Sequence, residues 1–155
     1  MSKLQEQEIL HIHACGARYY EESKKKAPHR AETGRLLPYV EEMPLYMAAA
    51  DLILCRAGAI TLAELARAGR AAILVPSPNV TADHQRKNAY AYKDRGAALV
   101  LEEKELSGEA LLRVLTRLKE SPSELRLLEQ RIKELDYESA EREFLKTALS
   151  LVTKK

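Results

Sequence analysis

Aromatic residues and excess charge are both scarce in this sequence. Its 155 residues include no tryptophan and one phenylalanine, so it has few of the side chains on which nucleic-acid bases usually stack. The 25 basic residues are interspersed with 23 acidic ones, and the formal net charge is +2. A chain with so little excess positive charge has no electrostatic basis for binding a polyanion. We therefore expect no nucleic-acid partner.

Cysteine and long apolar stretches are scarce as well. The two cysteines, Cys15 and Cys55, each lie next to a strand-like segment and are too few for a disulfide framework, which predicts reduced thiols. No apolar run approaches the roughly 18 residues that span a bilayer. Residues 5–8 (Gln-Glu-Gln-Glu) are polar, unlike the start of a signal peptide. These features predict a cytoplasmic protein.

Short apolar segments alternate with helical patterns along most of the chain. Hydrophobic residues make up 46% of the sequence, enough for the core of about one domain at this length. Strands that alternate with helices predict an α/β fold, with a mostly parallel sheet and helices on both of its faces. We expect one domain over residues 1–155. The expected strands are 9–13, 35–37, 52–55, 72–75 and 98–101, and the expected helices are 19–26, 44–50, 61–67, 84–94, 107–120, one that begins at Pro122, and 138–152.

Residues 55–64 (Cys-Arg-Ala-Gly-Ala-Ile-Thr-Leu-Ala-Glu) carry the clearest functional pattern. An apolar strand ends at Cys55, small residues follow, and apolar residues recur at helical spacing from Thr61. Small residues let the backbone approach a ligand closely, and a helix N-terminus at a sheet edge attracts anions, most often phosphate. The pattern predicts a phosphate site in which Glu64, one turn into the helix, reaches the adjoining ribose.

The same residues have a purely structural interpretation. Thr61-x-x-Glu64 is the pattern of a capping box, in which both side chains bind N–H groups of their own helix. Small residues are also common in tight turns between a strand and a helix. Arg56, at the strand end, either faces a diphosphate or is simply solvated or ion-paired. The residues alone leave both interpretations open.

A second strand-loop-helix unit follows directly. A buried-strand pattern ends at Pro76, a polar loop covers residues 77–83, and another helix opens at His84. Because ligands of open α/β sheets bind at the carboxyl ends of the strands, both units place polar groups along one edge. Gln85 and Asn88 are three residues apart and share a helical face. Their amides suit sugar hydroxyls because each both donates and accepts hydrogen bonds.

Possible metal ligands occur near the N-terminus. His11, His13 and Cys15 alternate along an expected strand, so their side chains would face the same way, as in a three-ligand zinc site. A turn at Gly16 would swing Cys15 out of line. We therefore expect hydrogen-bonded histidines at a sheet edge and no metal.

Four motifs, in order and spacing, resemble the C-terminal half of the bacterial peptidoglycan N-acetylglucosaminyltransferases, GT-B enzymes of glycosyltransferase family 28. They are residues 38–43 (Pro-Tyr-Val-Glu-Glu-Met), 56–64, 75–78 (Val-Pro-Ser-Pro) and 83–89 (Asp-His-Gln-Arg-Lys-Asn-Ala). The resemblance runs from about residue 8 to residue 135 and implies a Rossmann-like sheet. The chain departs from the family in lacking the first strand with its Gly-Gly-Ser-rich loop and the N-terminal acceptor domain. It also has Cys15-Gly16 where relatives have Thr or Ser before glycine.

The resemblance implies a domain that binds UDP-N-acetylglucosamine for transfer to lipid-linked N-acetylmuramoyl-pentapeptide. The implied partners are that donor, the missing N-terminal acceptor-binding domain and, through it, the lipid-linked acceptor, with the full enzyme peripheral on the cytoplasmic face of the membrane. No cofactor, metal or catalytic residue is implied in this chain, so we expect the fragment alone to be inactive. Residues 136–155 are expected to form a helix that packs on the missing domain. The implied donor-binding residues are Val40 (at the uracil ring), Arg56, Gly58, Ala59, Ile60, Thr61, Glu64, His84, Gln85 and Asn88.

Two other classes of function stay open. The chain could be the donor domain of another nucleotide-sugar enzyme, such as a glycolipid glycosyltransferase or a UDP-N-acetylglucosamine epimerase. It could also be a non-catalytic nucleotide-binding module that needs a partner chain. Preference among donor and acceptor molecules separates these alternatives.

Overall fold

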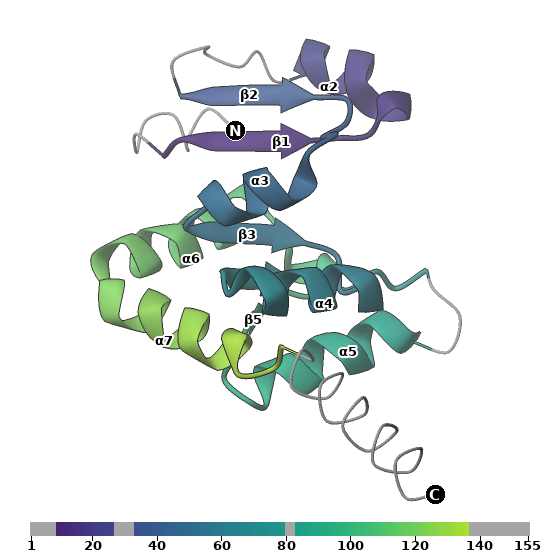
Figure 1. The fold of residues 1–155 in the computed structure, drawn as a ribbon. Coiled ribbons are helices and arrows are strands. Elements are labelled where there is room, and N and C mark those ends of the chain that lie inside the picture. Colours follow the sequence, from purple (N-terminus) through teal and green to yellow (C-terminus); the bar gives the residue numbers. More distant parts are fainter. Residues whose placement is uncertain (1–8, 27–32, 80–82, 137–155) are drawn as a thin grey trace, which may run out of the picture. The chain divides into compact units, whose positions relative to one another are not determined.

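The computed structural model describes residues 9–26, 33–79 and 83–136. The chain divides into two compact units, residues 1–43 with 106–120 and residues 44–105 with 121–155. Figure 1 labels the helices and strands. We describe each unit by itself.

The first unit is built on two parallel strands. They pair residue by residue, so that His11 lies opposite Gly34 and Ala14 lies opposite Leu37. The amphipathic helix of this unit buries Leu118. Its elements are β1 (His11–Ala14), the 3-10 helix η1 (Ala17–Tyr19), α2 (Tyr20–Lys26), β2 (Gly34–Leu37) and α6 (Gly108–Glu120).

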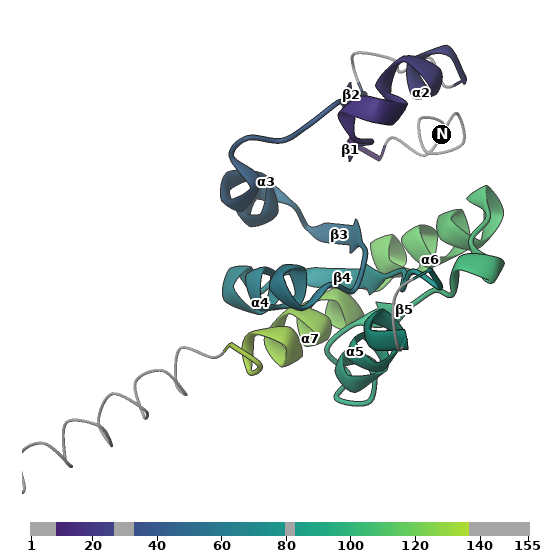
Figure 2. The same ribbon diagram turned by 90° about the vertical axis from the view of Figure 1, so that its right-hand side faces the viewer.

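The second unit contains a three-stranded parallel sheet in the order β3-β4-β5. The central strand is buried along its whole length, as expected for a parallel strand covered by helices. Helices α4 and α7 lie side by side, and α7 also packs on β4 (Figures 1 and 2). The elements are α3 (Met43–Ala49), β3 (Leu52–Cys55), α4 (Ala59–Ala68), β4 (Ala71–Leu74), α5 (His84–Lys93), β5 (Leu99–Val100), the 3-10 helix η3 (Glu103–Glu105) and α7 (Pro122–Lys133).

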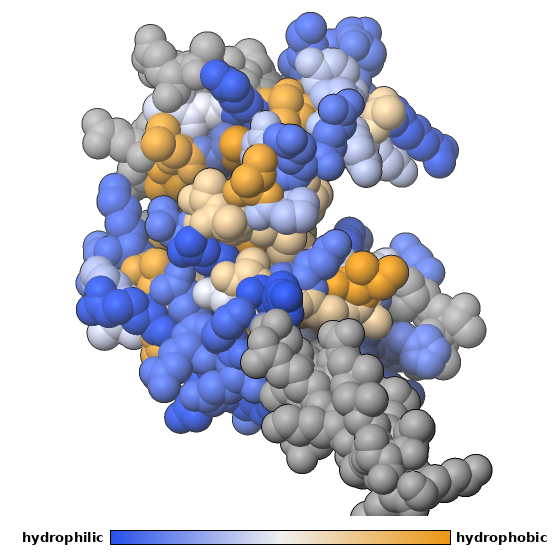
Figure 3. All heavy atoms as spheres, in the orientation of Figure 1, coloured by the Kyte–Doolittle hydropathy of each residue, from blue (hydrophilic) through white to orange (hydrophobic). Residues whose placement is uncertain are grey.

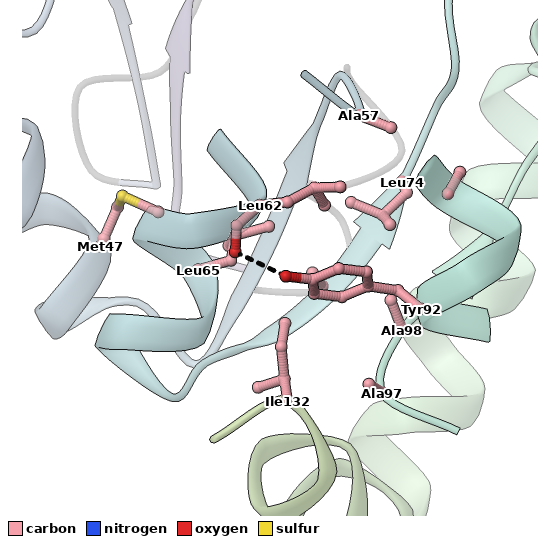
Figure 4. Packing of buried hydrophobic residues seen from close by; sticks show 11 residues of the cluster. Met47, Ala57, Leu62, Leu65, Leu74, Tyr92, Ala97, Ala98 and Ile132 are labelled. Carbon is pink, nitrogen blue, oxygen red and sulfur yellow. Dashed lines mark hydrogen bonds between the residues drawn. The ribbon is translucent and has the colours of Figure 1, made fainter. Parts of the chain in front are cut away.

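The core of the second unit lies between this sheet and its helices. Leu65, Leu74 and Ile132, from α4, β4 and α7, are fully buried in it (Figure 4). Tyr92 of α5 enters the same core, and its hydroxyl donates to the backbone carbonyl of Leu62 at 3.2 Å. The outer face of α7 carries hydrophilic side chains (Figure 3), which matches the burial of its opposite face.

The predicted α/β, Rossmann-like fold is confirmed, with a difference in its sheet. Every expected strand and helix within the described residues is present, with ends that differ by two residues or fewer. The strands form two parallel sheets, β1-β2 and β3-β4-β5, rather than the single sheet that was expected. The division into one domain stays a prediction, and the expected helix 138–152 lies outside the described residues. Within the described part of the chain, no helix has the length and apolarity to cross a bilayer.

Candidate functional site

The turn after β3 consists of small residues and lies at the carboxyl edge of the sheet. Ala57 is fully buried, and Gly58 is the N-cap of α4 with extended backbone angles (φ −68°, ψ 145°). A Cβ at Gly58 would meet no described atom closer than Thr61 Oγ1 at 3.8 Å, which is ordinary van der Waals contact. The packing of the described residues therefore does not itself require glycine at position 58.

Helix α4 begins two residues earlier than predicted, and the capping box, one of the two interpretations that the sequence left open, is not formed. The N–H of Leu62 donates to the Gly58 carbonyl at 3.0 Å, so the helix starts at Ala59 and Thr61 is its third residue. Among the residues that the structure describes, no side chain makes a capping hydrogen bond to this N-terminus. The N–H groups of Ala59, Ile60 and Thr61 precede the first intrahelical bond and have no acceptor within the helix. With the helix dipole, they form an anion-binding end that points at the sheet edge.

Glu64 is an exposed residue in the second turn of α4. Burial is the main cause that raises the pKa of the Cys55 thiol to about 11, and the charge of Glu64 contributes to the rise. The charge of Glu64 therefore acts on the thiol at the last residue of β3. Because Glu64 is not part of a cap, its carboxylate is available to accept hydrogen bonds from a ligand.

Arg56 is ion-paired, one of the alternatives that the sequence left open. Its Nη1 donates to Glu103 Oε2 at 2.5 Å and to the Val75 carbonyl at 3.3 Å. The side chain therefore crosses from the end of β3, past the end of β4, to the 3-10 helix that follows β5. About half of its surface stays exposed, 50% of the side chain.

The two amides of α5 hold the loops of the site. Gln85 Oε1 accepts from the Ser77 N–H at 3.0 Å, and Asn88 Nδ2 donates to the Ala57 carbonyl at 3.2 Å. Asn88 thereby joins the second strand-helix unit to the turn of the first. His84 is exposed at the first position of α5, and its N-cap, Asp83, has a left-handed backbone (φ 54°). The structure thus brings Asn88 and the turn before α4 together, as the sequence predicted for the two units.

Val40, the residue expected at the uracil ring, belongs to the first unit. Its side chain is buried, 6% exposed, whereas the neighbouring Tyr39 is 72% exposed. A buried side chain leaves the backbone as the part of Val40 that a base edge would pair with. The contact of Val40 with a uracil ring stays a prediction.

The histidines of β1 make local contacts. The His11 ring lies over Gly34, where a Cβ would come within 2.5 Å of it, and His11 Nδ1 is 3.1 Å from the Ile9 carbonyl. Partial burial, and secondarily His11, lower the pKa of His13. The Cys15 thiol points to the Leu37 carbonyl at 3.5 Å. No three potential ligands among the described residues are grouped as a metal site.

A hollow of about 470 Å³ lies beyond the ends of β4 and β5. It is lined by the loop after β4, by Arg86 and by residues 102–104, which the sequence analysis missed. Glu102 accepts from Arg86 Nε at 3.2 Å and from the Tyr90 hydroxyl at 2.9 Å. The sequence did contain a signal for this part of the site. Glu102 and Glu103 directly follow the expected strand 98–101, at the sheet edge where ligands bind.

The chain resembles known glycosyltransferases in sequence. The chain matches the glycosyltransferase family 28 C-terminal domain over residues 1–147. Over 141 residues it is 36% identical to the UDP-N-acetylglucosamine–N-acetylmuramyl-(pentapeptide) pyrophosphoryl-undecaprenol N-acetylglucosamine transferase of Myxococcus xanthus, covering 91% of this chain and 37% of that protein. The protein of the same name from Symbiobacterium thermophilum is 47% identical over 107 residues, covering 69% of this chain and 29% of that protein.

A solved structure agrees with these relatives. The crystal structure of Acinetobacter baumannii MurG matches with a TM-score of 0.71 at 35% identity, over 81% of this chain and 36% of that chain. The chain therefore spans well under half the length of the relatives that it matches. Because the family match covers nearly all of its residues, the chain belongs to glycosyltransferase family 28 and is a C-terminal domain of that family.

Proposed function

We propose that this chain is the UDP-N-acetylglucosamine-binding half of a transferase that adds N-acetylglucosamine to undecaprenyl-diphosphate-N-acetylmuramoyl-pentapeptide. The observation that carries the proposal is the N-terminus of α4, which opens from the end of β3 with no side-chain cap and has Glu64 beside it. The names of the relatives, at 36% and 47% identity, supply the identity of the donor and acceptor.

In this proposal the nucleotide lies along the carboxyl edge of the β3-β4-β5 sheet. The first N–H groups of α4, from Ala59 to Thr61, bind the diphosphate, and Gly58 lets it approach the backbone. Glu64 accepts hydrogen bonds from the ribose hydroxyls, and the backbone of Val40 pairs with the uracil edge. Arg56 adds a positive charge next to the diphosphate.

The sugar lies towards α5 in the same proposal. Gln85 and Asn88 each use one amide atom to hold a loop, which leaves Gln85 Nε2 and Asn88 Oδ1 for sugar hydroxyls. His84, exposed at the start of α5, completes this side of the site. The amides thus both shape the loops and contact the sugar.

Transfer itself requires groups that this chain does not supply in the proposal. A general base must come within about 3 Å, or one water, of the acceptor hydroxyl, and no donor-site residue is assigned that role. The acceptor is bound by a further part of the enzyme, at the cytoplasmic face of the membrane. The 155-residue chain then binds the donor without turning it over.

The test combines binding with turnover. Calorimetric titration should show binding of UDP and UDP-N-acetylglucosamine, with weaker binding of ADP because its purine does not match the uracil contacts. A radiolabel-transfer assay with the lipid-linked acceptor should show no product from this chain alone. Equal binding of ADP and UDP would refute the donor assignment, and robust transfer by the isolated chain would refute the division of labour.

A further inference from the structure

Arg56 is held in an extended position by two contacts made by one nitrogen. Nη1 donates both to the Val75 carbonyl, just after β4, and to Glu103 Oε2, just after β5. Since the strand order is β3-β4-β5, the side chain is stretched along the carboxyl edge of the sheet. Without Glu103, the Val75 contact at 3.3 Å would be left to hold a long, half-exposed side chain.

The rest of the guanidinium remains available to a ligand. Arginine has five N–H donors in a planar fork that suits phosphate oxygens. Within the described part of the chain, Arg56 forms its hydrogen bonds through Nη1. Nε and Nη2 therefore keep their donors, on a side chain that is 50% exposed.

The segment that carries Glu103 is itself fixed. The adjacent Glu102 is 19% exposed and accepts from both Arg86 and Tyr90 of α5. These contacts anchor the start of η3 to the helix that bears Gln85 and Asn88. The backbone that carries Glu103 is thus anchored at the edge of the sheet, whereas its side chain is 40% exposed.

We propose that Glu103 is a positioning residue for donor binding: it holds Arg56 along the edge of the sheet so that the free side of the guanidinium meets the diphosphate. The inference rests on the proposed function and names a residue outside the recognised motifs. The competing possibility is that Glu103 acts as an internal anion that must be displaced before the diphosphate can bind Arg56. The two predict opposite effects when the carboxylate is shortened.

Glu103→Asp is the discriminating variant. It keeps the negative charge but loses one methylene, so the carboxylate no longer reaches Arg56 at 2.5 Å. If Glu103 positions Arg56, UDP should bind the variant roughly threefold to fivefold more weakly, a loss of the size that an exposed ion pair contributes. Binding of uridine, which lacks the diphosphate, should not change.

The measurements are calorimetric titrations of the full 155-residue chain with UDP and with uridine. Glu134→Asp is the matched control, because Glu134 is also ion-paired, to Arg131 at 3.3 Å, but at the end of α7. Glu103→Asp should have no further effect in an Arg56→Lys background, since lysine keeps the charge but not the fork.

Each other outcome has a defined meaning. Unchanged or tighter UDP binding by Glu103→Asp overturns the positioning role, and equal losses for UDP and uridine overturn it as well. If Arg56→Lys binds UDP normally, the diphosphate does not need the guanidinium fork of Arg56, and the inference fails while the rest of the site stands. If the unsubstituted chain binds no UDP, the proposed function fails and the inference fails with it.

Discussion

Glu64→Gln separates a ligand contact from a structural role. Helix α4 begins at Ala59 with Gly58 as its N-cap and has no side-chain capping bond, so the Glu64 carboxylate does not hold the helix together. We expect the variant to melt at the temperature of the unsubstituted chain. We expect UDP binding to weaken, because the variant loses a charged acceptor for the ribose hydroxyls. Calorimetric titration with UDP measures the change.

The size of the effect follows from the chemistry of the contact. A hydrogen bond to a charged group contributes about 1.5–3 kcal/mol. Each 1.4 kcal/mol is a factor of ten in affinity, so full loss would weaken binding roughly tenfold to a hundredfold. Glutamine keeps one neutral oxygen acceptor, which places the expected loss near the lower end, at about tenfold.

A second readout reports the position of Glu64 without any ligand. The pKa of Cys55 is about 11, mainly through burial and in part through the charge of Glu64. Removing that charge leaves the burial and lowers the thiol pKa, so more thiolate is present at a fixed alkaline pH. Alkylation of Cys55, measured in a Cys15→Ser background, should therefore be faster in Glu64→Gln than in the control Glu134→Gln.

The two readouts together decide the interpretation. Faster alkylation with unchanged UDP affinity would place Glu64 beside the turn and remove it from the binding site. A lower melting temperature with normal UDP affinity would mean that Glu64 stabilises the helix, contrary to the geometry of its N-terminus. Either result would refute the reasoning.

Three further changes test the site and its support. Gln85→Ala should weaken UDP-N-acetylglucosamine binding more than UDP binding, and equal losses would place Gln85 on the nucleotide. Ile132→Ala, at a fully buried position, should cost about 2–5 kcal/mol in urea unfolding, against about 1 kcal/mol for Ile132→Val. Gly69→Ala should cost about 1 kcal/mol, because φ is +63° and the new Cβ would lie 3.0 Å from Lys133 Cδ. Gly108→Ala should be near neutral, because within the described residues a new Cβ there would meet nothing within 4 Å beyond its own chain neighbours and helix backbone.

Local patterns were sufficient to predict most elements of this fold. The strand over Leu52–Cys55 was predicted with its observed ends, because a short apolar run followed by a small-residue turn is typical of a buried parallel strand. The end of α4 followed from Gly69, whose left-handed backbone stops the helix. These features depend on a few neighbouring residues, so a single sequence contains them.

The start of α4 shows where a local pattern misled. Thr61-x-x-Glu64 has the spacing of a capping box, but that pattern predicts a start only if the backbone before it cannot be helical. Ala59 and Ile60 can be helical, and the helix extends over them to Gly58. The start therefore depends on where β3 ends, which is set by its pairing with β4 rather than by the residues of the helix.

The polar contacts of the site could not be predicted, because they join residues far apart in the chain. Arg56 and Glu103 are 47 residues apart, and Asn88 and Ala57 are 31 apart. In the structure these side chains support the same turn and loops that the proposal assigns to the donor. A substitution there changes both the shape of the site and a contact within it, so its effect on one ligand cannot assign a role. Comparison of uridine, UDP and UDP-N-acetylglucosamine separates the two, because a change in shape affects all three ligands whereas a lost contact affects only those that carry the group it binds.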